Sequence, residues 1–208
     1  RKVKTKVKGF RTTDGAGVKL VRVLGNLTTK EFDPILMLDS FDSINPDDYT
    51  AGFPMHPHRG IETISYVSRG KMVHRDSLGN EAGISDGEVQ WMNSGSGIMH
   101  EEMVPAAERL LGVQLWLNLP AKDKMSKPSY NSIKNEDIKE IEIEGGKIRL
   151  LAGKYGEHEG YKGDYLSMDY YDIHLNADAE VTLTMEEDDS VMVFTLLGDV
   201  YIDGEHIE

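Results

Sequence analysis

Short apolar or alternating runs recur along the whole chain, whereas a helical repeat is hard to find. Successive side chains of a β-strand point to opposite faces, so alternation of apolar and polar residues is typical of strands. The most helix-like window, residues 101–111, is interrupted by Pro105. Turn-forming pairs such as Asp86-Gly87 and Asp203-Gly204 separate the runs. The pattern predicts an all-β sandwich or barrel, such as a jelly roll, with strands over residues 18–23, 61–67, 89–92, 113–119, 148–151, 181–185 and 191–197.

The predicted strands form two series, separated by a polar stretch that contains Pro128 and has the composition of a connector. We therefore expect two tandem β domains, residues 1–120 and residues 146–208, joined by a linker over residues 121–145. The second domain should be incomplete at residue 208. No sequence repeat relates the two series, so the duplication is an architectural inference.

Composition excludes several classes of protein. The chain has 208 residues, 39% hydrophobic and 28% charged, as a folded globular protein has. It has no cysteine, which excludes a disulfide scaffold, a thiolate metal site and a cysteine nucleophile. No apolar run approaches the roughly 20 residues of a membrane helix, and none resembles a signal peptide. We expect a cytoplasmic protein without a membrane partner.

Charge is unevenly distributed. The net charge is −13, yet residues 1–22 carry eight lysines and arginines against one acid. The rest of the chain, residues 23–208, is therefore strongly acidic and repels the phosphate backbone of nucleic acids, so we expect no nucleic-acid partner. A chain of this charge is consistent with a soluble monomer. Residues 1–8 alternate lysine or arginine with valine or threonine, which predicts an edge strand guarded by lysines; the alternative is a docking arm for an acidic protein partner.

Histidines provide the strongest chemical signal. His56 and His58 are two residues apart, as are His100 and Glu102, so each pair shares one face of an extended strand. If the two segments face each other inside one barrel, three imidazoles and a carboxylate converge, a set that suits a divalent first-row metal with open positions. Hydrogen-bonded structural histidines are the alternative. Glu62 competes as a ligand, but a strand would place it about 13 Å beyond His58.

The same residues resemble a known family. His56-x-His58-x-x-x-Glu62 is similar to the first cupin motif; the second motif is looser, with Asn93 in place of the usual proline and His100 two residues late. These departures are those of the pirin family, which residues 33–39, 52–63, 74–80 and 89–103 resemble closely. The resemblance is dense over the first half of the chain and extends to the second half by layout alone.

Membership of that family would imply two tandem cupin barrels with one metal in the first barrel. Pirins usually hold iron, and their ligands correspond to His56, His58, His100 and Glu102, with Glu62 not a ligand. We therefore expect Fe(II), although manganese, nickel, copper or zinc would accept the same ligands. The second barrel typically lacks a metal, in agreement with His174, which has no partner histidine nearby in the sequence.

Three functions then compete. Some pirins are quercetinases, so the first is a dioxygenase that cleaves a flavonol-like aromatic substrate with O2; Glu102 would be its general base. His74, paired in sequence with Asp76, is a second candidate catalytic residue at the cavity rim, or else belongs to a capped turn before Ser77. The second function is a metal-dependent regulatory protein that binds a protein partner such as a transcription factor. The third is a barrel that the metal merely stabilises.

Overall fold

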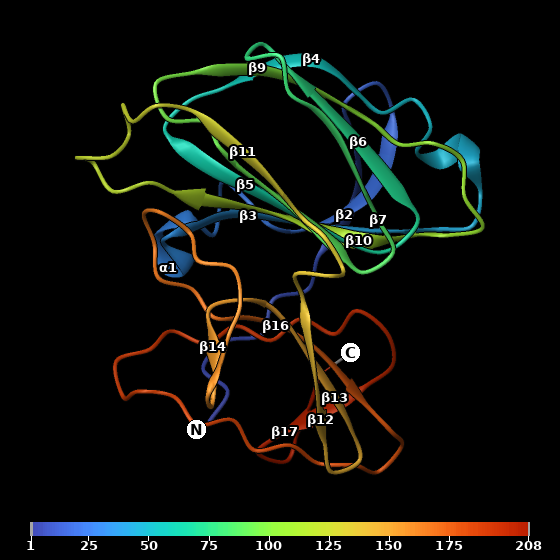
Figure 1. Cartoon of the computed structure of the whole chain (residues 1–208). Helices are drawn as coiled ribbons and strands as arrows, with labels where there is room; N and C mark the ends of the chain where they lie inside the picture. Colours follow the sequence, from blue (N-terminus) through green and yellow to red (C-terminus); the bar gives the residue numbers. More distant parts are fainter. Residues whose placement is uncertain (1, 208) are drawn as a thin grey trace.

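The computed structural model describes residues 2–207 and confirms the all-β fold (Figure 1). Helix is confined to one turn, α1 (Thr29–Phe32), and one 3-10 turn, Pro46–Asp48. None of the helices in the described chain is long and apolar enough to cross a membrane. The strands of the first unit are β1 (Phe10–Asp14), β2 (Val18–Leu24), β3 (Ile35–Ser43), β4 (Phe53–His58), β5 (Ile61–Arg69), β6 (Lys71–Asp76), β7 (Glu81–Ser85), β8 (Glu88–Asn93), β9 (Ile98–Met103), β10 (Leu110–Asn118) and β11 (Ser129–Ile133).

Two antiparallel sheets face each other in this first unit. One has seven strands in the order β1-β2-β3-β10-β5-β8-β11, and the other has four in the order β4-β9-β6-β7. At one end an apolar cluster fills the space between them, with Val67 of β5 against Met72 of β6 and Ile84 of β7. At the other end of the sandwich the side chains that face the interior are polar. The candidate site lies there.

The second unit packs against the outer face of the seven-stranded sheet (Figure 1, orange to red). Its Leu151, Ala152 and Tyr170 join a core cluster with Ile64 and Trp91 of the first unit. Because this sheet is covered on both faces, its central strands β5, β8 and β10 are buried on both sides. The strands of the second unit are β12 (Lys139–Ile143), β13 (Gly146–Ala152), β14 (Lys154–Tyr155), β15 (His158–Glu159), β16 (Tyr170–Leu175), β17 (Val200–Ile202) and β18 (Glu205–Ile207).

The segment predicted to be a linker, residues 121–145, contains two strands. β11 pairs with β8 and completes the sheet of the first unit, whereas β12 pairs with β13 and begins the sheet of the second unit. The chain therefore crosses between the units over residues 134–138. The domain limits at residues 120 and 146 stay a prediction.

Two strand predictions are wrong. No strand of the described chain covers residues 181–185 or 191–197. Phe194 and Leu196 pack on the core between the units without joining a ladder, whereas Val191, Met192, Val193 and Leu197 are exposed. Residues 2–9 also lie outside every strand. Instead of guarding an edge, Lys6 forms an ion pair of 3.0 Å with Glu205 of the second unit. Alternation in these segments reflects side-chain burial and charge rather than backbone pairing.

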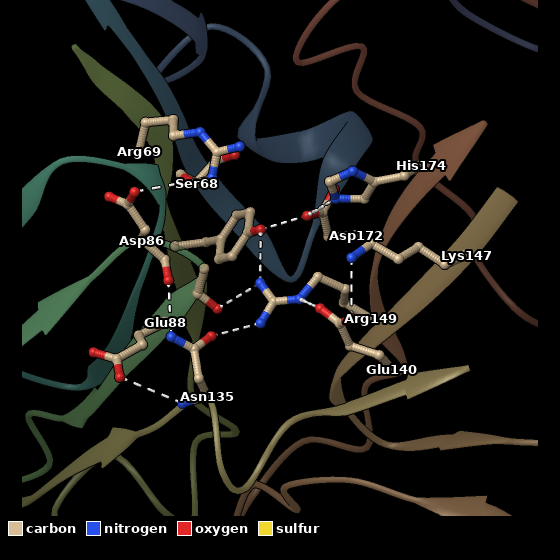
Figure 2. Close-up of polar contacts among 12 residues, drawn as sticks. Ser68, Arg69, Asp86, Glu88, Asn135, Glu140, Lys147, Arg149, Asp172 and His174 are labelled. Atoms are coloured by element: carbon tan, nitrogen blue, oxygen red, sulfur yellow. Dashed lines mark hydrogen bonds and ion pairs between the residues drawn. The ribbon is translucent and has the colours of Figure 1, made fainter. Parts of the chain in front are cut away.

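A polar network around Arg149 of β13 joins the two units (Figure 2). The guanidinium donates to the carbonyl oxygen of Gly87 at 2.9 Å, to Asn135 Oδ1 at 2.6 Å and to Glu140 Oε1 at 2.9 Å. Nearby, the Tyr66 hydroxyl of β5 donates to Asp172 of β16. Arg149 is 7% exposed, and of its three acceptors the carbonyl oxygen belongs to a buried residue, Gly87, whereas Asn135 and Glu140 are exposed.

We predict that Arg149→Met lowers the free energy of unfolding by about 1–3 kcal/mol, because the buried carbonyl oxygen of Gly87 loses its donor. Lys147→Met is the matched control, since Lys147 lies on the same strand and also pairs with Glu140, at 3.0 Å, but is more exposed. It should cost less than about 1 kcal/mol. Urea unfolding measures both; equal effects of the two variants would contradict the role given to Arg149.

Candidate metal centre

Two paired strands bring the predicted histidines together. β4 and β9 run antiparallel with His56 directly opposite His100, and alternation puts His58 on the same face. The ring centroids lie 4.4 Å apart for His56 and His100, 4.8 Å for His56 and His58, and 4.9 Å for His58 and His100. One ring nitrogen from each lies within 4.8 Å of the other two. The two predicted histidine segments thus face each other, with their three imidazoles together.

The hydrogen bonds of these rings leave nitrogens free for a metal. His56 Nδ1 lies 2.8 Å from the carbonyl oxygen of Pro54, so it carries the proton and leaves a lone pair on Nε2. His56 Nε2 and His58 Nε2 are 3.0 Å apart, about the separation of two nitrogens bound at about 2.1 Å and a right angle to one ion. His100 Nε2 is buried without a hydrogen-bond partner. A divalent metal fits this group.

Burial also keeps the imidazoles of His58 and His100 neutral, which a metal ligand must be. Burial, with a smaller effect of His56, lowers the pKa of His58 to about 4. Burial, with its neighbouring histidines, lowers the pKa of His100 to about 2. At neutral pH both rings therefore present lone pairs rather than positive charge.

A cavity of about 640 Å³ opens beside the histidines. The ring of Trp116 from β10 contacts His58 edge to face, with centroids 5.0 Å apart, and its indole Nε1 is buried without a partner. The other lining residues combine apolar and charged side chains: Asp14, Gly15, Leu36, Met37, Asp39, Phe53, Pro54, His56, Pro57, Arg59, Ile61, Glu102 and Gln114. The site can therefore admit a small aromatic molecule next to the imidazoles.

Glu102 lines this cavity but is held by amides of the opposite sheet. Its carboxylate accepts hydrogen bonds from Gln114 Nε2 at 3.1 and 3.2 Å and from Gln90 Nε2, and the residue is 2% exposed. Burial raises its pKa, against the effect of those hydrogen bonds. Within the described chain, the group of mutually close ligand atoms contains the three histidines and no carboxylate. Glu102 as fourth ligand stays a prediction.

His74 does not lie at the cavity rim, and that prediction is wrong. The side chain is fully buried, its Nε2 is 2.9 Å from Asp76 Oδ2, and its Nδ1 is 3.3 Å from His100 Nδ1. The ring stacks on Tyr130 with centroids 3.9 Å apart. Although burial raises it, hydrogen bonds from His74 and Asn80 leave the pKa of Asp76 below its ordinary value. His74 therefore lies behind a candidate ligand rather than facing a substrate.

Glu62 is turned away from the histidines. Gly60, whose φ of 69° is in the left-handed region, bends the chain between β4 and β5 and breaks the strand parity that Glu62 would otherwise share with His58. Glu62 Oε1 accepts a hydrogen bond of 3.1 Å from the indole of Trp91, on the side of the sheet that faces the second unit. The geometry agrees with the expectation that Glu62 is not a ligand.

Sequence reasoning missed three residues of the site: Gln90, Gln114 and Trp116. Gln90 and Gln114 donate hydrogen bonds to the Glu102 carboxylate, and Trp116 lines the cavity. A signal was present, because a glutamine stands within each of the apolar runs at residues 89–92 and 113–119. A buried amide needs a polar partner, so each marks a polar interior.

Comparisons with known proteins agree with this picture. A family model described as Pirin matches residues 17–117. A Pseudomonas aeruginosa protein named "Putative quercetin 2,3-dioxygenase" is 42% identical, over 95% of this chain and 72% of that protein. Human Pirin is 34% identical, over 97% of this chain and 69% of that protein. The crystal structure of quercetin 2,3-dioxygenase from Acinetobacter baumannii matches 79% of this chain and 61% of its own, with 30% identity and a TM-score of 0.68. The chain thus spans less than two thirds of that solved structure.

We predict that His56→Ala and His100→Ala each lower metal affinity by more than about 100-fold, because each removes a ligand of the metal. Loss of a residue that only hydrogen-bonds to a ligand typically costs about 10–100-fold. Glu62→Gln, an equally buried change on the other face of the sheet, should retain one metal per chain. Mass spectrometry of metal content after loading and desalting measures all three. Full metal content in both histidine variants would exclude this ligand set, and its loss in Glu62→Gln would identify a different carboxylate.

Proposed function

The chain belongs to the pirin family, and from this premise we propose that it is a metal-dependent dioxygenase that opens the heterocyclic ring of a flavonol such as quercetin with O2. The observation that carries the proposal is the group of three imidazoles beside a cavity of about 640 Å³. That volume lies within the roughly 300–1,000 Å³ of small-molecule sites. The solved quercetin 2,3-dioxygenase that matches most of this chain supports the choice of substrate class.

The ligand set we propose is His56, His58, His100 and Glu102, with Fe(II) as the resident ion. Manganese, nickel, copper and zinc accept the same nitrogen and oxygen donors, so the donor set alone does not select iron. When bound, the ion supplies Lewis acidity, which stabilises the deprotonated 3-hydroxyl group of a flavonol. The protein's own contribution is to hold the three imidazoles together and to confine the aromatic rings in the cavity.

Glu102 is the residue we propose as general base. It lines the cavity, and the amides of Gln90 and Gln114 orient its carboxylate. A base has to lie within about 3 Å of the proton that it takes, and a hydroxyl group next to the histidines would meet Glu102 on the same wall. In the reaction O2 adds both oxygen atoms to the opened product while two ring carbon–carbon bonds break and one carbon leaves as carbon monoxide. His74 has both ring nitrogens engaged, so we give it no part in proton transfer from substrate.

The alternative is a metal-dependent binding protein. One observation favours it: Met55, Met99 and Met103 are 46%, 40% and 38% exposed on the two strands that carry the histidines. Alternation turns them outward where the histidines point inward, so a partner bound there would lie directly behind the metal centre. Methionine is common on adaptable binding surfaces.

We predict that Glu102→Gln lowers kcat for quercetin by about 100-fold or more, the range that a general base contributes, while substrate affinity falls less. The control is Glu101→Gln, since Glu101 is its neighbour but points outward to Arg75 at 3.2 Å. Metal-loaded protein is mixed with quercetin without oxygen and then with oxygen, and bleaching of the flavonol, oxygen uptake and carbon monoxide are recorded.

Two results would contradict the proposal. Wild-type protein with one metal per chain and no oxygen-dependent bleaching would exclude the dioxygenase and favour the binding protein. Equal kcat in wild type and Glu102→Gln, at equal metal content, would remove Glu102 as base.

A further inference from the structure

Three buried side chains of two neighbouring strands are joined in series by hydrogen bonds: His100, and behind it His74 and Asp76. His74 and Asp76 belong to β6 and His100 to β9, and Asp76 lies directly opposite His100 in the ladder. Asp76 Oδ2 is 2.9 Å from His74 Nε2, and His74 Nδ1 is 3.3 Å from His100 Nδ1. The exposed fractions are 6% for Asp76, 0% for His74 and 1% for His100. The series is therefore sheltered from water along its whole length.

The direction of each hydrogen bond follows from Asp76. Its Oδ1 accepts the backbone N–H groups of Leu78 and Asn80, at 2.9 and 3.1 Å, and its Oδ2 accepts the Asn80 side-chain amide at 2.8 Å. A carboxylate so surrounded by donors is an acceptor, so the proton in its bond with His74 sits on His74 Nε2.

The tautomer of His74 then determines the tautomer of His100. A neutral His74 with its proton on Nε2 has a lone pair on Nδ1, which accepts the Nδ1–H of His100. A neutral His100 with its proton on Nδ1 has its lone pair on Nε2. That atom is buried and has no partner, and His100 belongs to the candidate ligand group with His56 and His58. The opposite direction would put a proton on His100 Nε2, where the ion should bind.

We propose that Asp76 and His74 are positioning residues that fix His100 in the tautomer able to bind metal, through two hydrogen bonds in series. The inference rests on the proposed metal centre and assigns His74 a role other than proton transfer to substrate. His56 reaches the same tautomer more simply, through the Pro54 carbonyl oxygen. An outer partner of this kind typically changes metal affinity by 10–100-fold.

Asp76→Asn is the decisive variant, because it keeps the shape and reverses the series. The two backbone N–H groups require an oxygen at the Oδ1 position, so the new amide nitrogen occupies the Oδ2 position and donates to His74 Nε2. The Asn80 side-chain amide, which donates to Oδ2 in the wild type, turns to accept the second N–H with its oxygen. His74 then carries its proton on Nδ1 and donates to His100, whose own proton moves to Nε2. Metal affinity, measured by titration with Co(II) and its visible absorption, should fall about 10–100-fold.

Two further variants separate this role from a purely structural one. His74→Phe preserves the stack on Tyr130 but breaks the series, so adding Asp76→Asn to it should change Co(II) affinity less than twofold; an additive loss would contradict the proposal. Asn80→Ala removes another partner of the same carboxylate without reversing any bond, and its Co(II) affinity should equal that of the wild type.

A second measurement needs neither metal nor activity. Nitrogen-15 NMR of the imidazoles in metal-free protein, with His100 assigned by a His100→Gln variant, reports which nitrogen carries the proton. Wild-type protein should show His100 protonated on Nδ1, and Asp76→Asn should show it on Nε2. Wild-type His100 protonated on Nε2, or Asp76→Asn with unchanged tautomer and affinity, would overturn the proposal. Wild-type protein that shows the expected tautomer and binds Co(II), but does not turn over quercetin, would count against the proposed dioxygenase and leave this inference standing.

Discussion

The antiparallel pairing of β4 with β9 is the constraint on which the rest of the site depends. It places His56 opposite His100, and strand alternation then aims His58 and Glu102 toward the same interior. A slip of one residue would turn the whole set toward solvent. Burial in that interior keeps His58 and His100 neutral and makes every unpaired polar atom costly. The same burial therefore both creates the candidate ligands and demands the hydrogen bonds that orient them.

Those orienting bonds come from three directions. A backbone carbonyl oxygen from Pro54 serves His56, the Asp76–His74 series serves His100, and amides of the opposite sheet serve Glu102. Each supporting group belongs to a strand that the two facing sheets hold in place. The seven-stranded sheet is further stiffened from outside, because the second unit packs on its outer face and Arg149 ties the two units together. A site assembled in this way depends on the whole sandwich rather than on one loop.

Spacing along the sequence predicted how the histidines converge. It failed where the position of a side chain depends on residues far away in the sequence. The i, i+2 pairs at residues 56–58 and 100–102 predict the convergence of the histidines, because parity within one strand is a local property. The left-handed conformation of Gly60 interrupts the alternation of side chains between β4 and β5. The side of the sheet on which Glu62 lies therefore could not be predicted from its spacing to His58. His74 is buried because β6 is covered by Tyr130 of β11, a contact between residues far apart in sequence. The strands expected over residues 181–185 and 191–197 are absent for a similar reason, since a local pattern does not show whether a neighbouring strand is there to pair with.

The most direct test of the account is anomalous diffraction at the absorption edge of the metal, from crystals of the protein loaded with one equivalent of that metal. The account predicts one strong peak, within bonding distance of Nε2 of His56, His58 and His100, with the Asp76–His74 series intact behind His100. A peak at any other position, or a metal bound to His100 through Nδ1, would contradict it.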